Sequence, residues 1–328
     1  MLFLAGVFIN NLIHYTSEVF DVKIADNQVL KCRIVDSQAV IVSGQDVKGE
    51  LIIPQKISKS LFTFPVVSIE PGAFENNKQL TKVVLPEGLQ YIKYNAFASC
   101  TNLRDTVTLP VSLLGIGNYA FGGSAVGCVV VKSAYCHSLD TINYHDDFAG
   151  CFALKTVIVD KTVDTLCPFL FESSSDALEN VYFPDTLDKI AKSFLAYSHK
   201  LKNVRFPKTL NTVGSSAFFA SGIERVVLPN SVRQIESYAF RLCWQLRYLD
   251  IGENIENISE LALADMNVLD TLIIRNKKPP VCADNTFFVT DTHSFRVFVP
   301  AESVDLYKKN KHFSAMNIQP LQKETKKN

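Results

Sequence analysis

The sequence predicts a repeat solenoid: a right-handed superhelix, mostly β with short turns and helical segments, in which a parallel β-sheet forms one face. Three observations predict this fold. An aromatic residue recurs about every 23 residues, a strand pattern ending in proline is locked to it, and 47% of the 328 residues are hydrophobic, as in chains that fold. Because one unit of this length cannot bury its apolar side alone, neighbouring units must stack and share a core.

The aromatic series defines the repeat. Segments such as VVSIEPGAF (66–74), LQYIKYNAF (89–97) and VRQIESYAF (232–240) align on their last phenylalanine. The intervals between successive members are 23, 24, 27, 23, 23, 24, 22 and 23 residues, which indicates about nine coils. The predicted register consists of Phe74, Phe97, Phe121, Phe148, Phe171, Phe194, Phe218, Phe240 and, in the next place, Leu263.

The strand series lies at a fixed place between these aromatics. In the first such strand, alternation points Val83 and Leu85 into the core and Val84 outward. The proline that follows ends the strand's hydrogen bonding and opens a turn. An L-x-x-I step, such as Leu187 and Ile190, then leads to A-F and a short turn. The strands read VVLP (83–86), VTLP (107–110), VYFP (181–184), VRFP (204–207) and VVLP (226–229).

Small or polar residues follow each register aromatic by three positions, and Cys100, Cys151 and Cys243 share this place. Cys100 and Cys151 lie two coils apart, which is roughly 10 Å at the strand spacing of a sheet. A disulfide needs Cα atoms within about 7 Å. We therefore expect these cysteines to be small buried residues that are not linked to one another.

The unit resembles the BspA-type leucine-rich repeat, a family of surface proteins from Bacteroidetes and some protozoa. The likeness rests on the V-x-L-P, L-x-x-I and A-F-x-x-C-x-x-L steps, together with an opening β segment (31–54) and a closing KKPPVCADNTF…FRVFVPAESVDLYKKN segment. We expect an N-terminal β cap (20–66), a solenoid (67–273), and a C-terminal cap with a short helix from Ala301 to Lys311 and a polar tail (274–328). We expect residues 1–19 to be either a remnant of a signal or a disordered N-terminus, because LFLAGVFI (2–9) is apolar but has no basic residue before it.

Charge and composition exclude several classes of protein. The 33 basic and 33 acidic residues give no net charge, which removes the electrostatic case for nucleic acid or an anionic membrane as the main partner. No apolar run is long enough for a transmembrane helix, so we expect no such segment. Eight cysteines in this length are too few for a disulfide-stapled scaffold.

Motifs that could carry chemistry have a simpler explanation in the repeat. GIGNYA (115–120) fits a dinucleotide fingerprint, but it falls where other coils read IKYNAF and VGSSAF, and GGSAVG (122–127) follows in the turn. The irregular 27-residue interval holds several possible metal ligands without the spacing of a zinc site. We expect no catalytic, metal-binding or cofactor-binding residues. The possible ligands are Cys128, Cys136, His137, His145, Asp146 and Asp147.

The outward face of the predicted sheet is the candidate binding surface, because solenoids use such faces to bind partners. Tyrosine and arginine, which are enriched among interface hot spots, gather there on neighbouring coils. The opposing interpretation is that Val, Ile, Thr and Tyr are simply good strand formers. The predicted ligand-binding residues are Tyr182, Arg205, Arg225, Val227, Tyr248 and Asp250.

Together these features favour a non-catalytic binding protein, monomeric, that engages a protein or glycan through its sheet face. The resemblance implies a cell-surface or secreted adhesion module. An alternative is an intracellular interaction scaffold of the same fold, at a cytoplasmic location, since unpaired cysteines favour a reducing compartment. A hydrolase or metal site in residues 122–148 is the third hypothesis.

Overall fold

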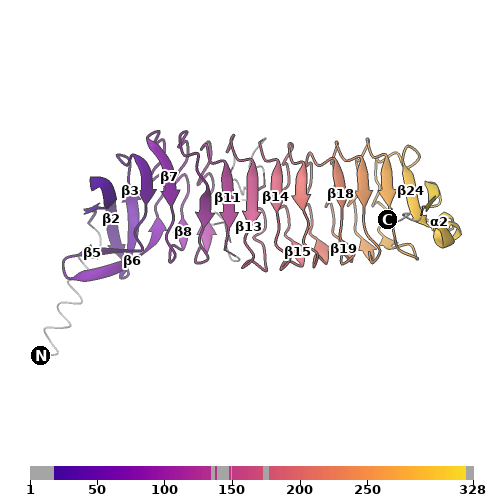
Figure 1. Ribbon diagram of the computed structural model, residues 1–328, viewed down its shortest axis with the longest axis horizontal. Helices are drawn as coiled ribbons and strands as arrows, with labels where there is room; N and C mark the ends of the chain where they lie inside the picture. The colour runs from indigo at the N-terminus through magenta and orange to yellow at the C-terminus, as the bar shows by residue number, and fades with distance from the viewer. Residues whose placement is uncertain (1–17, 134–136, 139–147, 149, 173–176, 323–328) are drawn as a thin grey trace, which may run out of the picture. The chain divides into compact units, whose positions relative to one another are not determined.

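The computed structural model describes residues 18–133, 137–138, 148, 150–172 and 177–322, and it divides into two compact units, Met1–Leu154 and Lys155–Asn328. Each unit is a stack of coils that contribute parallel strands (Figure 1). The predicted repeat solenoid is therefore confirmed. The apolar segment 2–9 and residues 134–136 and 139–147 of the irregular interval, with Cys136, His145, Asp146 and Asp147, lie outside the described residues.

The first unit opens with antiparallel strands. β1 (Phe20–Lys23) pairs with β2 (Val29–Val35) across the short helix η2 (Ala25–Asn27), and β2 pairs with β3 (Gln38–Ser43). A second antiparallel pair is formed by β5 (Lys56–Lys59) and β6 (Phe62–Ile69).

Parallel stacking begins inside this predicted cap. β3 pairs in parallel with β6, and β4 (Gly49–Ile52) pairs in parallel with β7 (Leu80–Val84). The segment that we predicted as an N-terminal cap therefore already contributes strands to the parallel sheets, well before residue 67.

Each coil carries two strands rather than one. The first strand series of the first unit consists of β7, β9 (Val107–Leu109) and β11 (Cys128–Val131), of which β7 and β9 carry the V-x-L-P pattern and β9 and β11 pair in parallel. The L-x-x-I steps form a second parallel series that runs from β6 through β8 (Tyr91–Ile92) and β10 (Gly115–Ile116) to β12 (His137–Ser138). Only the first series was predicted, because two-residue strands leave almost no alternation in a sequence.

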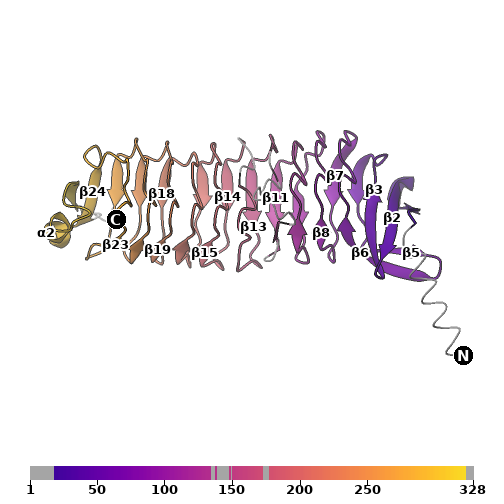
Figure 2. The same cartoon turned by 180° about the vertical axis from the view of Figure 1, so that it is seen from behind.

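The second unit repeats this arrangement, as Figure 2 shows from the other side. Its first series forms two groups: β13 (Thr156–Val159), β14 (Asn180–Tyr182) and β16 (Asn203–Arg205), then β18 (Arg225–Val227), β20 (Tyr248–Asp250), β22 (Thr271–Ile273), β24 (Arg296–Pro300) and β25 (Asn317–Leu321). Its second series consists of β15 (Lys189–Ile190), β17 (Thr212–Val213), β19 (Gln234–Ile235), β21 (Asn257–Ile258) and β23 (Val281–Cys282).

The end of the second unit continues the ladder beyond residue 273, because β23, β24 and β25 all pair in parallel with their neighbours. Parallel pairing therefore continues past Pro279 and Pro280, into the segment that we predicted as a C-terminal cap. The predicted helix is present but shorter, as η3 (Ala301–Ser303) and α2 (Val304–Lys308). Tyr307 of α2 is fully buried, and its hydroxyl donates to the carbonyl of Asn276 at 3.1 Å.

The register aromatics form the core. In the first unit the rings of Phe74, Phe97, Phe121 and Phe148 are fully buried and stack with centroids 4.9, 5.2 and 5.1 Å apart. Phe218 and Phe240 stack in the same way at 5.3 Å. These columns confirm the predicted register for six of its members.

One register residue was predicted wrongly. The Leu195 amide donates to the Ala217 carbonyl, just as the Phe97 amide donates to the Ala120 carbonyl, so Leu195 and not Phe194 takes the register place. Phe194 stands where other coils have alanine and is nevertheless buried. Its ring meets Phe171 edge-on at 78° instead of stacking.

The turn around each register residue holds two backbone positions with left-handed φ. They lie two residues before and two residues after the aromatic, for example Asn95 (φ 55°) and Ser99 (φ 56°). The amides of these two residues and of the register residue donate to carbonyls of the next coil, so the turns form a third column of hydrogen bonds between coils.

The residue three places after the aromatic closes this turn from inside. Cys100, Cys151 and Cys243 are fully buried, as predicted, and each thiol donates to the carbonyl of a phenylalanine in the coil before, at 3.0–3.1 Å. Thr290 makes the same bond with its hydroxyl at 3.0 Å.

The GIGNYA segment belongs to the repeat, as predicted. Gly115 and Ile116 pair with Tyr91 and Ile92 of the previous coil. At Gly117 an added Cβ would lie 2.3 Å from the Tyr94 backbone nitrogen. This glycine is therefore required by the close approach of two coils, which explains the pattern without a nucleotide.

Candidate binding surface

Five of the six predicted ligand-binding residues form what we call the tyrosine–arginine face, on the first strand series of the second unit. Tyr182 and Arg205 are direct partners in the β14–β16 ladder. Arg225 and Tyr248 are partners in the β18–β20 ladder. Tyr182 and Val227 are 43% and 48% exposed. The face consists of Tyr182, Arg205, Arg225, Val227 and Tyr248.

The Arg225–Tyr248 pair is the most ordered part of this face. The guanidinium carbon of Arg225 lies 3.6 Å from the centroid of the Tyr248 ring, which is the geometry of a cation–π contact. Arg225 remains exposed and Tyr248 is half-buried. The contact holds both side chains in place without a carboxylate partner, so less conformational entropy remains to be lost on binding.

Arg205 is held differently. Its Nη2 lies 3.3 Å from Oδ2 of Asp185, and both side chains are exposed to about half. Such an exposed pair contributes little stability. The ladder is also interrupted after β16, because β16 and β18 belong to different groups of paired strands. The two pairs of the face therefore lie on two separate ladders.

Asp250, the sixth predicted residue, is buried rather than exposed. Its residue exposure is 2%, and its carboxylate accepts two hydrogen bonds from Nε and one from Nη2 of Arg275, the last at 2.8 Å. It also accepts from the Gly252 amide at 3.1 Å. Because Arg275 comes from the next coil and folds over it, this carboxylate is engaged within the protein, and we leave it out of the tyrosine–arginine face.

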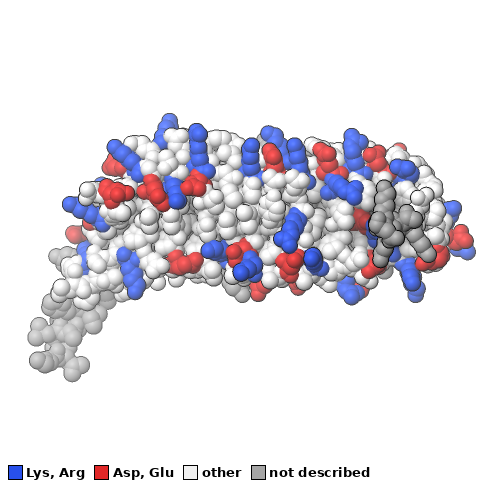
Figure 3. Space-filling model, in the orientation of Figure 1, with Lys and Arg blue, Asp and Glu red and all other residues white. Residues whose placement is uncertain are grey.

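Charges of both signs are interspersed on the surface, and no large patch of one sign gathers on the side shown in Figure 3. This distribution agrees with the absence of net charge. Recognition on such a surface depends on local contacts more than on long-range attraction.

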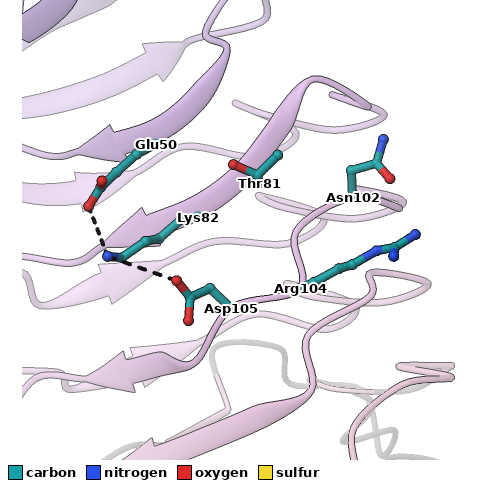
Figure 4. A pocket seen from close by; sticks show the side chains of 6 residues that line it. All are labelled: Glu50, Thr81, Lys82, Asn102, Arg104 and Asp105. Carbon is teal, nitrogen blue, oxygen red and sulfur yellow. Dashed lines mark ion pairs between the residues drawn. The ribbon is translucent and has the colours of Figure 1, made fainter.

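The first unit has a shallow charged hollow of about 720 Å³ beside β7 (Figure 4). Lys82 lies between Glu50 and Asp105, with Nζ–O distances of 3.1 and 3.8 Å. The hydrogen bond from Lys82 to Glu50, and the charges of both carboxylates, raise the pKa of Lys82. Arg104 and Asn102 lie on the other side of the hollow (Figure 4). The prediction from sequence missed Arg104, because it lies in the turn before a strand and outside the alternation.

A second hollow of about 260 Å³ lies on the turns of the second unit and contains Tyr197, Phe219 and Tyr238. These residues were also missed. The signal that identifies them is an aromatic side chain at turn positions where several other coils carry serine, asparagine or alanine, although Tyr119 and Phe169 share the place of Tyr238.

In the described part of the chain, no group of three or more His, Cys, Asp or Glu residues is placed to hold a metal ion. Cys128, the one possible ligand of the irregular interval whose side chain is described, is half-buried on β11, and burial raises the pKa of its thiol. None of the helices among the described residues has the length and apolar character needed to cross a membrane.

The family model for the BspA type leucine rich repeat region matches this chain in six copies, over residues 67–193 and 169–288. The chain therefore belongs to the BspA-type leucine-rich repeat family. A comparison with curated proteins found no match.

Solved structures of leucine-rich repeat proteins are similar over most of the chain. A leucine-rich repeat protein from Bacteroides ovatus is 16% identical, with a TM-score of 0.41 over 93% of this chain and 99% of its own. A leucine rich cell surface protein from Faecalibacterium prausnitzii is 14% identical, with a TM-score of 0.46 over 94% and 96%. The pneumococcal vaccine antigen PcpA is 17% identical, with a TM-score of 0.40 over 94% and 99%.

Proposed function

We propose that this protein is a non-catalytic interaction module that binds a protein partner through the tyrosine–arginine face. The observation that carries the proposal is the exposed Arg225 stacked on Tyr248, with Val227 exposed on the same strand as Arg225. A planar guanidinium can stack on a ring or pair with a carboxylate, and tyrosine offers a large contact area with a polar tip.

The composition of the face favours a protein over a glycan. Tyrosine and arginine are enriched at hot spots of protein interfaces, and the exposed Val227 adds an apolar contact between them. The outward direction of these side chains also separates binding from folding, because none of them belongs to the core.

The test is a double variant, Tyr182→Ala with Arg225→Ala, compared with the unchanged protein in an affinity capture from secretions or extracts of the natural environment. We expect at least one captured protein to be depleted with the variant. Binding to that protein, measured by titration calorimetry, should weaken by about 2 kcal/mol or more, the lower bound for a hot spot.

Tyr94→Ala is the matched control, because Tyr94 is 51% exposed but lies in the first unit. It should capture the same proteins as the unchanged chain. If the double variant folds normally by circular dichroism and captures the same proteins with the same affinity, the tyrosine–arginine face is not the binding surface.

We propose a cell-surface or secreted location, by analogy with the surface proteins of this family. Detection by antibody on intact cells supports it, and recovery of the protein only in the cytoplasmic fraction favours the intracellular scaffold instead. The hypothesis of a hydrolase or metal site in residues 122–148 depends on possible ligands most of which lie outside the described residues, and metal analysis of the purified protein tests it.

A further inference from the structure

The hollow on the turns of the second unit, which we call the turn hollow, is a second surface with binding chemistry of its own. It has a volume of about 260 Å³, and four consecutive turns line it, from Glu172 to Arg241, with Tyr197, Phe219 and Tyr238 on its walls. The rings of Tyr197 and Phe219 meet at 67° with centroids 5.3 Å apart, and Tyr197 is 41% exposed. Nothing in the tyrosine–arginine face takes part in it.

The repeat explains why a hollow forms here. Ala196, Ser193 and Ser216 are small and lie in the floor, whereas the equivalent positions in the following coils carry Phe219 and Tyr238. Small residues beside large ones on adjacent turns leave a recess between ring faces. The recess is smaller than the roughly 300–1,000 Å³ of sites for drug-sized ligands, so it suits a single ring.

The backbone at these walls follows the repeat. Tyr197 and Tyr238 have left-handed φ values of 61° and 62°, and the same places carry Ser99 and Asn95 in the coil around Phe97. Other coils also carry bulky residues there, such as Tyr119 and Leu242. The turn therefore accepts small and large side chains alike, and the hollow arises from the side chains rather than from the backbone.

The floor of the turn hollow holds polar groups that are open to a ligand. Ser193 is only 4% exposed, and neither its hydroxyl nor that of Ser216 has a hydrogen-bond partner within the described part of the chain. The cation at the edge is already engaged, because Nε of Arg241 lies 2.7 Å from Oδ2 of Asp265. Glu172 adds a carboxylate to the lining, so the hollow combines aromatic faces and neutral hydroxyls with an acidic residue.

We propose that the turn hollow binds one pyranose ring of a glycan. The apolar C–H face of the sugar packs on Tyr197 or Phe219, and its hydroxyls pair with Ser193 and Ser216. A proline ring could also pack on these aromatics, but it has no hydroxyl to satisfy the two serines. The proposal does not depend on the protein partner of the tyrosine–arginine face.

The test is saturation-transfer difference NMR on the full chain with methyl β-galactopyranoside, methyl β-glucopyranoside and methyl α-mannopyranoside as probes. We expect at least one of them to receive saturation, strongest at the ring protons of one face. Tyr197→Ser, which copies Ser99, should reduce that signal by about fivefold or more through loss of ring packing. Tyr238→Asn, which copies Asn95, tests the opposite wall.

Two controls accompany this measurement. Both variants should keep the thermal midpoint of the unchanged protein, because each installs the residue that another coil carries at that place. Tyr182→Ala should keep the sugar signal, which separates this site from the tyrosine–arginine face. Absence of saturation for all three glycosides, an unchanged signal in folded Tyr197→Ser, or saturation only of an oligoproline peptide would overturn the proposal.

Discussion

At the scale of single residues, burial controls the chemistry of the cysteines. Burial raises the pKa of the thiols of Cys100, Cys151 and Cys243 to about 12, although hydrogen bonds to the coil before act in the opposite direction in each case. These thiols stay protonated at neutral pH and act as small hydrogen-bond donors inside the turn column. Their role is structural, which agrees with their place in the repeat.

The raised pKa predicts a loss of stability in alkali. For Cys243 the pKa rises from 9.0 in the unfolded chain to about 12 in the fold. Its contribution is complete below pH 9 and is lost as the pH rises toward 12, because the unfolded thiol then releases a proton that the folded one keeps. Urea titrations at pH 8 and pH 10 should show Cys243→Ser losing about 1.4 kcal/mol less than the unchanged protein.

Ser198→Ala is the control for this measurement, because Ser198 holds the same place in another coil and does not ionise in this range. It should lose as much stability between the two pH values as the unchanged protein does. Equal losses in all three proteins would show that the Cys243 thiol is not buried.

Phe97 is the residue that best tests the aromatic column. It is fully buried, and its ring stacks between Phe74 and Phe121. Phe97→Ala should lower the free energy of unfolding by about 3–5 kcal/mol, the usual cost for a buried phenylalanine. In a stack of coils, hydrogen exchange should quicken first in the coils beside it. A loss under about 1 kcal/mol in a denaturant titration would contradict the register.

At the scale of the elements, the coil around Leu195 departs from the rule that the other coils follow. Most coils place alanine before a register phenylalanine, but this one places Phe194 before Leu195 and still buries both. The column of stacked rings is interrupted there, and Phe194 packs edge-on against Phe171. Two different packings therefore satisfy the same turn backbone.

Exchanging the two residues tests this interpretation. Phe194→Ala alone should cost about 3–5 kcal/mol, because it leaves a cavity. The double variant Phe194→Ala, Leu195→Phe restores the common A-F order and should recover about 1 kcal/mol or more of that loss, a coupling expected of neighbours. Thermal and urea unfolding of the three proteins provide the measurement. A double variant less stable than Phe194→Ala would show that the turn cannot accept the common order.

Sequence predicted the strands and the register wherever the signal is local. The V-x-L-P strands and most aromatics were predicted correctly, because alternation and a fixed interval are visible in the chain itself. The second strand series, such as Gln234–Ile235, was missed because two residues cannot show an alternation. The place of Leu195 was missed because two adjacent hydrophobic residues fit the interval equally well.

The candidate site was less predictable, for a tertiary reason. Outward positions such as Tyr182 follow from strand alternation, and the structure places that residue as expected. Burial of Asp250 depends on Arg275, which arrives from the following coil 25 residues later. The turn hollow depends on residue size across four coils, and one sequence does not reveal which turn side chains remain exposed.

At the scale of the whole molecule, neutrality governs its behaviour in solution. The chain has no net charge and an isoelectric point near 7.0. Molecules without net charge repel one another weakly, so solubility at low salt should be lowest near pH 7. Light scattering of the full chain across about pH 5.5–8.5 measures how solubility varies with pH. Added salt should leave the pH of the solubility minimum almost unchanged. A minimum displaced by more than about one pH unit would mean that the charges do not titrate as expected.

The columns of hydrogen bonds between coils have a genetic consequence. Each coil donates along its turn to the next coil and accepts from the one before, so a tandem duplication of a gene segment that encodes one whole coil supplies both sets of partners at once. Insertions of any other length do not supply a matching set of partners and must be absorbed outside these columns. The length of such a protein can therefore change in whole coils during evolution, and each added coil brings fresh outward positions for selection while the buried column is merely copied.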